Sequence, residues 1–253
     1  MAYLKHTSLP ENQFLLKHNF RIWNACSTLL PVSSACFMPE FEAKSCQKFP
    51  VRLIKTVRLR APYIEGLFKD PKLNLKVIVL VRDPRGVMRS RSEMSWCDQP
   101  MCNNITSVCK DLHRDVAEAL RLGAEYQDRI TMVRYEDLST SPYKTMDKLI
   151  NFLGLPSMPE FMDKYLESHT GKYRFPATEE AKVQVEEEGP YGTKRESSEK
   201  TAFKWTHYLD KEFIKDIEET CIEPMTTLGY KSYQEHSSIE DILGKTSSEV
   251  WPY

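Results

Sequence analysis

The chain has 253 residues, of which 41% are hydrophobic and 28% charged, as is usual for a soluble domain with one full core. Its formal net charge of −1 excludes bulk electrostatic attraction to nucleic acid, so any anion site must be local. No apolar run reaches the roughly 18–20 residues that a membrane span needs, and the first residues lack the apolar core of a signal peptide. The sequence as written therefore predicts no membrane span and offers no visible targeting signal.

The first part of the chain is expected to be irregular, and alternating elements follow it. Residues 1–48 read as an irregular segment with one short helix near residues 14–25. Hydrophobic periodicity then predicts a strand over 51–56, a helix over 62–68, a strand over 77–81 and a helix over 84–92.

The same periodicity continues through the second half. It predicts a long helix over 107–126, a strand over 130–135, a helix over 142–153 that Gly154 ends, and a short helix over 161–168. Residues 171–200 are polar and read as a mobile loop. Asp210 is the expected N-cap of an amphipathic helix that runs to Leu228, and Gly229 closes it. Residues 231–253 form a polar tail, ordered at most near 239–243. The alternation predicts a three-layer α/β domain with a parallel sheet over residues 49–230.

One stretch carries more information than any other, LKVIVLVRDPRGVMRSR at residues 75–91. An apolar strand runs into Arg-Asp-Pro-Arg, and Pro84 then suits the first turn of a helix. Ligands bind at the carboxyl ends of strands in open α/β sheets, and a helix N-terminus beside arginines favours phosphate. Arg82 at the strand end and Ser90 two turns along the helix are both expected to reach one phosphate.

VRDPRGVMRSR resembles the 3′-phosphate-binding segment of Golgi carbohydrate 6-O-sulfotransferases, which move sulfate from 3′-phosphoadenylyl sulfate (PAPS) to a sugar hydroxyl. Three further segments resemble this family in the same order: FPVRLIKTVRLR (49–60), MVRYEDLSTSPYKTMDKLINFLGL (132–155) and FKWTHYLDKEFIKDIEETCIEPMTTLGY (203–230). The resemblance covers about residues 20–230. It implies a P-loop/sulfotransferase-type fold, PAPS as donor without a metal, a glycan acceptor and a Golgi lumenal location.

The family's glycine-containing loop that grips the 5′-phosphosulfate has no counterpart before Phe49. Residues 1–20 hold no glycine, although a phosphate-cradling loop needs backbone N–H groups crowded around the anion. The chain is therefore expected to lack the first βα unit of the family. Two readings stay open: a sulfotransferase, and a non-catalytic remnant that binds the nucleotide or glycan or partners a full-length enzyme, as a homo- or hetero-oligomer.

The resemblance also assigns roles to individual residues. The residues that match Arg82 and Ser90 hold the 3′-phosphate in the family. Arg85 is a weaker cofactor candidate, because it shares a helix face with Arg89 and a solvated face is the simpler reading of both. Trp205 is expected to pack or to wall the adenine ring, while Thr206 stands where the family has an arginine.

The catalytic base is not assigned. Lys55 lies where cytosolic sulfotransferases carry a lysine at the sulfate bridge, but Val57 replaces their histidine base. Lys55 is thus a candidate for stabilising the leaving group, against the simpler reading of a solvated lysine. Glu136 and Asp137 could perform acid/base work, although tying the strand to arginines is the preferred interpretation.

Cysteine usage points to an oxidising compartment. The chain has one sequon, Asn104-Ile105-Thr106, and seven cysteines: Cys26, Cys36, Cys46, Cys97, Cys102, Cys109 and Cys221. Lumenal disulfides with one unpaired cysteine explain this pattern, and free buried thiols beside a chance sequon are the alternative. Zinc is disfavoured because no Cys-X-X-Cys pair occurs and His169 and His207 stand alone.

Overall fold

The computed structural model describes residues 24–26, 28, 39–57, 59–175, 192–233 and 238–245. The chain divides into two compact units, Met1–Arg58 and Leu59–Tyr253. In the first unit, helix α3 spans Pro39–Lys48, where an irregular segment was expected. Of the short helix predicted near residues 14–25, only 24–25 are described, and they are helical together with Cys26.

The predicted strand over residues 51–56 is wrong. These residues adopt no helix or strand, and every side chain from Val51 to Val57 is exposed. Their β-branched composition favours extended backbone, but strand propensity reflects packing against neighbours more than backbone preference. Without a hydrogen-bonded neighbour, such a segment stays irregular.

The second unit is built on a parallel sheet of strands β1 (Val77–Val81) and β2 (Ile130–Arg134), as the periodicity predicted. They pair in register from Val77 opposite Ile130 to Val81 opposite Arg134. All five residues of β2 are buried, because helices cover it on both faces. The crossover from β1 to β2 contains α5 (Pro84–Ser92), η5 (Ser95–Cys97), α6 (Pro100–Asn103) and the long α7 (Ile105–Glu125).

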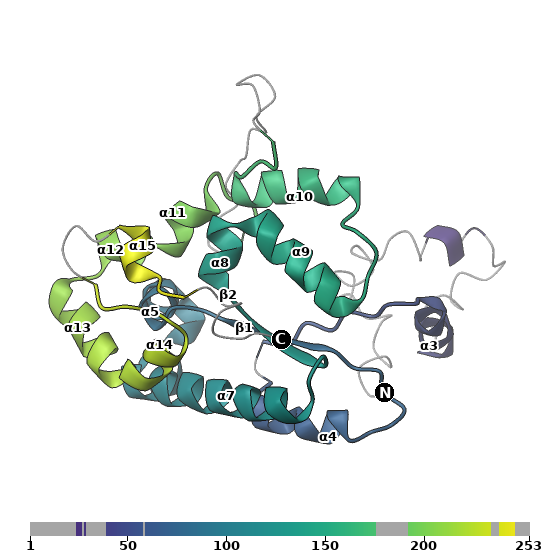
Figure 1. Ribbon diagram of the computed structural model, residues 1–253, viewed down its shortest axis with the longest axis horizontal. Coiled ribbons are helices and arrows are strands. Elements are labelled where there is room, and N and C mark those ends of the chain that lie inside the picture. Colours follow the sequence, from purple (N-terminus) through teal and green to yellow (C-terminus); the bar gives the residue numbers. More distant parts are fainter. Residues whose placement is uncertain are drawn as a thin grey trace. The chain divides into compact units, whose positions relative to one another are not determined.

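Helices flank the two strands on opposite sides in this unit (Figure 1). On one side lie α7 and α4 (Glu65–Phe68), which follows η4 (Ala61–Tyr63); on the other lie α8 (Tyr135–Thr140), α9 (Pro142–Leu153) and α10 (Glu160–Thr170). The main core joins β1, β2 and α7 through residues such as Val81, Leu122 and Met132. The predicted three-layer α/β architecture is confirmed, with two strands among the described residues.

The last helices gather near α5, at the carboxyl ends of the strands (Figure 1). They are α11 (Ser198–Ala202), α12 (Trp205–Tyr208), α13 (Lys211–Thr220), α14 (Ile222–Thr227) and α15 (Ile239–Ile242). Asp210 caps α13 as predicted, accepting from the Phe213 N–H at 2.8 Å. The single helix expected over 210–228 is broken at Cys221, because Pro224 cannot donate to the carbonyl four residues earlier.

The loop expected over residues 171–200 is described only at its two ends. Ser198 is buried and its hydroxyl donates to the carbonyls of Ser139 (2.7 Å) and Thr170 (3.1 Å). Gly171 has φ +65°, and a Cβ there would come within 1.8 Å of the Glu196 carbonyl oxygen, so only glycine fits. The predicted mobility of this loop concerns mainly residues 176–191, which lie outside the described residues.

Two disulfides lie in the second unit, as the cysteine pattern suggested. Cys97 pairs with Cys102 across a short loop, and Cys109 of α7 pairs with Cys221 between α13 and α14. Cys26 is also disulfide-bonded, and Cys46 is an exposed free thiol in α3. Across the described ranges, no helix has both the length and the apolar character to cross a membrane.

The Cys109–Cys221 disulfide is expected to stabilise the fold more than Cys97–Cys102 does. Its 112-residue separation restricts the unfolded chain by about 5 kcal/mol, against about 2 kcal/mol for the five-residue separation of the other pair. Chemical denaturation of the Cys109→Ala/Cys221→Ala variant should therefore show the larger loss, with Cys97→Ala/Cys102→Ala as the matched control. Equal losses, or the reverse order, would contradict this.

Candidate functional site

The turn after β1 is shaped by Asp83. Its carboxylate is fully buried and caps α5, because Oδ1 accepts the Arg85 backbone N–H at 2.9 Å. Pro84 occupies the first helical position, where its missing N–H needs no partner. The strand–turn–helix predicted from the sequence is therefore confirmed, and its N-cap is the aspartate of the Arg-Asp-Pro-Arg stretch.

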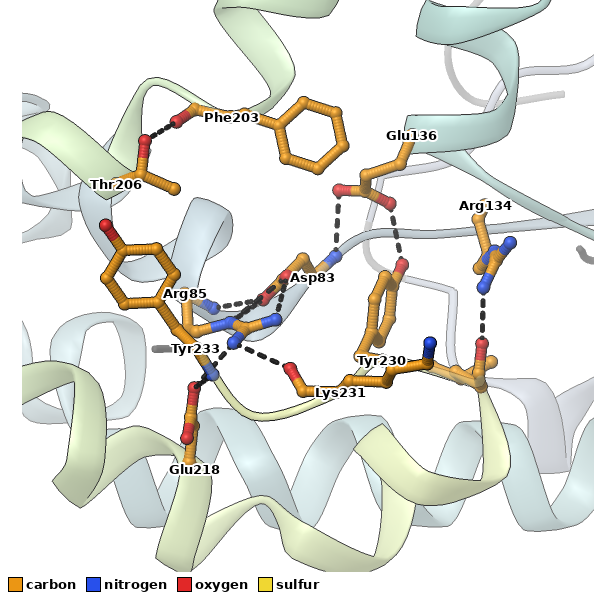
Figure 2. A network of polar contacts seen from close by, with 11 residues as sticks. Asp83, Arg85, Arg134, Glu136, Phe203, Thr206, Glu218, Tyr230, Lys231 and Tyr233 are labelled. Carbon is orange, nitrogen blue, oxygen red and sulfur yellow. Dashed lines mark hydrogen bonds and ion pairs between the residues drawn. The ribbon is translucent and has the colours of Figure 1, made fainter. Parts of the chain in front are cut away.

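Arg85 is buried completely, so the expected solvated helix face is wrong for this residue. Its Nε and Nη2 donate to Asp83, with Nη2 2.7 Å from Oδ2, and its Nη1 donates to Glu218 at 2.5 Å and to the Lys231 carbonyl at 3.0 Å (Figure 2). The guanidinium also stacks 4.2 Å from the Trp205 ring. With these partners, Arg85 is not available to hold a phosphate.

The charge of Arg85 is secured by its neighbours. Burial alone would lower its pKa, but the negative charges of Asp83 and Glu218 outweigh burial and raise that pKa above its ordinary value. Glu218 also accepts the Tyr233 N–H at 2.8 Å. One buried cation thus joins the turn after β1 to α13 and to the chain that follows Tyr230.

A second buried carboxylate, that of Glu136 just after β2, supports the same turn. Glu136, at the start of α8, accepts the Asp83 N–H at 3.1 Å and the Tyr230 hydroxyl at 2.6 Å (Figure 2). Burial, and next the charge of Asp83, raise the pKa of Glu136 to about 7, although the Tyr230 and backbone hydrogen bonds oppose this. Burial likewise raises the pKa of Tyr230 well above its ordinary value.

Asp137 joins its strand to an arginine, as preferred from the sequence. Arg134 at the end of β2 donates from Nε (2.9 Å) and Nη2 (2.7 Å) to the Asp137 carboxylate, and from Nη1 to the Leu228 carbonyl (2.9 Å). Its side chain is almost fully buried. Glu136 and Asp137 thus both serve the packing of the strand ends.

Arg82 contrasts with these arginines. It is half-buried, and its guanidinium carbon lies 4.6 Å from the centre of the Tyr135 ring. Its Nε is buried without a hydrogen-bond partner. A buried N–H donor without a partner is unfavourable, so such an atom calls for an acceptor, either an ordered water or a bound ligand.

Gly86 brings a second such donor close to Arg82. A Cβ at Gly86 would lie 3.2 Å from Arg82 Nε and 3.4 Å from Trp205 Cδ1, the ring carbon bonded to Nε1. Trp205 Nε1 and Arg82 Nε are the only buried side-chain nitrogen or oxygen atoms without a partner in the described parts of the chain. Both unpaired donors therefore lie close to the same glycine, and a side chain at position 86 would crowd Arg82 and Trp205.

Ser90 lies one turn beyond Gly86 on the same face of α5 and is half-buried. Arg89 is less solvated than expected, because its side chain, 12% exposed, pairs with Glu93 at 2.7 Å and stacks 4.5 Å from Tyr208. Packing, one of the two roles expected for Trp205, is confirmed by its 1% exposure. Sequence reasoning missed Gly86, Glu218 and Tyr230; a glycine in the first turn after the strand was the one available signal.

The structure brings Arg82, Arg85, Ser90 and Trp205 together in one unit. Lys55 belongs to the Met1–Arg58 unit, where it is exposed and lies outside any helix or strand. Arg60, in the second unit, pairs with Asp111 and Asp115.

The donors of the Arg82 region suit an oxygen-rich anion. Phosphate oxygens are strong acceptors, and the two unpaired donors at Gly86 and the Ser90 hydroxyl can donate to them. Within the described residues, no group of three or more His, Cys, Asp or Glu side chains is arranged to hold a metal ion.

Comparison with known proteins assigns the chain to a family. A model of the sulfotransferase domain matches residues 25–229, so this protein belongs to the sulfotransferase domain family. It is 32% identical to human carbohydrate sulfotransferase 1 in an alignment 211 residues long that covers 75% of this chain and 47% of that protein. It is 27% identical to human carbohydrate sulfotransferase 3, covering 75% of this chain and 40% of the relative.

The chain spans about half the length of the curated relatives it matches. Zebrafish (Danio rerio) carbohydrate sulfotransferase 1, for example, is 28% identical, and the alignment covers 79% of this chain and 49% of the zebrafish protein. Among solved structures, the sulfotransferase domain from the curacin biosynthetic pathway matches 62% of this chain and 54% of its own, with 21% identity and a TM-score of 0.42.

Glu136 is expected to make stability depend on pH. Its pKa is near 7 when folded and about 4.5 when unfolded, so the folded state holds the proton more tightly. The stabilisation is therefore complete below about pH 4.5 and is lost as the pH rises to about 7. Denaturant titrations at pH 5 and pH 7.5 should show a smaller pH difference in the free energy of unfolding for Glu136→Gln than for the wild type. Glu125→Gln, on the exposed end of α7, is the control that should leave the difference unchanged.

Proposed function

We propose that this protein is a PAPS-dependent sulfotransferase that places sulfate on a sugar hydroxyl of a glycan. The observation that carries the proposal is the pair of unpaired buried donors, Arg82 Nε and Trp205 Nε1, beside Gly86 at the carboxyl end of β1. The names of the relatives supply the reaction class, and the sequence resemblance supplies the donor and the 6-hydroxyl as the position.

In this proposal, Arg82 and Ser90 bind the 3′-phosphate and select PAPS over nucleotides that lack it. The 3′-phosphate lies away from the reacting sulfur, so these residues orient the donor and do not touch the transferred group. The acceptor hydroxyl loses its proton to a base, its oxygen bonds to sulfur, and adenosine 3′,5′-bisphosphate leaves with the bridging oxygen. Lys55 is the candidate that offsets the charge on that oxygen.

The compartment follows from the same reasoning. Two disulfides in the second unit suit an oxidising lumen, and the resemblance specifies the Golgi. A sugar-bearing acceptor would be available there. The proposed partner is therefore a glycan.

A second candidate function is a nucleotide-binding protein that does not transfer sulfate. One observation favours it: Val57 stands where cytosolic sulfotransferases carry their histidine base, and no other residue is assigned as the base. The Arg82 region would still bind adenosine 3′,5′-bisphosphate. The two candidates thus share one binding site and differ in turnover.

Binding is expected to depend on Arg82. Calorimetric titration with adenosine 3′,5′-bisphosphate should show the Arg82→Ala variant about 10- to 100-fold weaker than the wild type, as loss of a charge-assisted hydrogen bond implies. Arg89→Ala removes a cation from α5, the helix that follows Arg82; this cation is already paired with Glu93, so the variant should bind almost normally. Equal weakening in both variants would indicate a general charge effect and would contradict a site at Arg82.

Turnover separates the two candidates. Transfer of radiolabelled sulfate from PAPS to a mixture of N-acetylglucosamine- and galactose-terminated oligosaccharides should be measurable, and Lys55→Ala should reduce the turnover rate by roughly tenfold or more with unchanged nucleotide affinity. Lys48→Ala, an exposed lysine in the same unit, is the matched control. Nucleotide binding without sulfated product would support the non-catalytic candidate.

A further inference from the structure

The sequence contains one Asn-X-Ser/Thr triplet, Asn104-Ile105-Thr106, and the structure places it between the two disulfides of the second unit. Asn104 is exposed in the junction between α6 and α7, and Thr106 is exposed in the first turn of α7. Both side chains that a glycosylating enzyme recognises are therefore accessible at the surface.

In the side-chain amide of Asn104, the oxygen caps a helix and the nitrogen is free. Its Oδ1 caps α7 by accepting the Ser107 N–H at 3.0 Å. The cap uses only the oxygen, so the nitrogen Nδ2 remains available for a covalent bond. A sugar on Nδ2 leaves the carbonyl oxygen in place, which means that modification and helix capping are compatible.

A surface hollow lies directly beside this amide. It measures about 410 Å³, within the range of small-ligand sites, and is lined by residues 103–106 on one side and by α13 on the other. The α13 side offers the half-buried Phe213 ring and the exposed polar side chains of Asp216, Glu219 and Thr220. An apolar wall beside carboxylates and a hydroxyl suits a sugar, which has apolar C–H faces and hydroxyl donors.

We propose that Asn104 carries an N-linked glycan whose first sugar lies in the hollow against α13. Asn104 Nδ2 forms a bond to C1 of an oligosaccharide supplied as a lipid-diphosphate donor, the C1–O bond to the diphosphate breaks, and the amide proton is lost to a base of the transferring enzyme. Seated there, the sugar links the start of α7 to α13 on the surface near Cys109–Cys221. This inference rests on the lumenal location in the proposed function.

The test uses the full chain behind a cleavable secretory leader in a eukaryotic cell line. The secreted wild type should carry a glycan that an Asn-glycan amidase removes, and mass spectrometry should locate the resulting aspartate at 104. Thr106→Ala should abolish the glycan, and the matched Thr106→Ser should retain it. A secreted chain with both disulfides formed and an unmodified Asn104 would overturn the proposal.

A separate measurement, the melting temperature with and without the glycan, tests whether the first sugar lies against α13. Amidase treatment leaves aspartate at position 104, which still caps α7, so the cap does not confound the comparison. Removal of the glycan should lower the melting temperature of the wild type by about 2–4 °C and that of Glu219→Ala by less. Glu219 is exposed, so its replacement leaves the core intact. An unchanged melting temperature after removal in the wild type would overturn the seating. Titration with adenosine 3′,5′-bisphosphate on the treated protein tests the nucleotide site separately.

Discussion

The buried ion pair between Asp83 and Arg85 is the interaction on which the candidate site depends. Both side chains are fully removed from water, which is unfavourable unless each charge is matched and fully hydrogen-bonded. Asp83 is matched by the guanidinium and by the N–H that it caps, and Arg85 also reaches Glu218 and the Lys231 carbonyl. Removing Arg85 would leave the Asp83 carboxylate buried without a cation, a loss of roughly 3–5 kcal/mol.

This pair fixes the backbone that presents Arg82. The turn is held on the α13 side through Glu218 and on the β2 side through Glu136, whose carboxylate accepts the Asp83 N–H. Arg82 is the neighbour of that held residue, and Tyr135 supports its guanidinium from one side. Two arginines only three positions apart therefore differ in their surroundings: Arg85 organises the turn, and Arg82 keeps an unpaired Nε–H donor.

Much of this arrangement could be predicted from the sequence. The all-apolar strand, the proline at the first helical position and the caps at Asp210 and Gly229 follow from local rules, and the structure confirms them. The strand expected over 51–56 failed because strand formation needs a partner that local sequence does not specify. The buried state of Arg85 could not be read from helical spacing, because its partner Glu218 lies 133 residues away in the chain.

The role of Gly86 also depends on residues that are distant in the sequence and so could not be predicted from local sequence. A glycine in the first helical turn signals a close approach, but the residues that approach it are Arg82 from the turn and Trp205 from a helix far along the chain. Sequence resemblance identified Arg82, Ser90 and Trp205 as candidates. The approach of Arg82 and Trp205 to one glycine, and the unpaired donors beside it, could be seen only in the three-dimensional structure.

The most direct test of this account is a ¹⁵N NMR titration that observes arginine Nε–H and tryptophan indole N–H signals. On addition of adenosine 3′,5′-bisphosphate, the Arg82 Nε–H and Trp205 Nε1–H resonances should shift, since both donors gain an acceptor. The Arg85 Nε–H, already bonded to Asp83, should stay in place and exchange slowly with solvent. A shift of Arg85 with no change at Arg82 would contradict the assignment of roles to the two arginines.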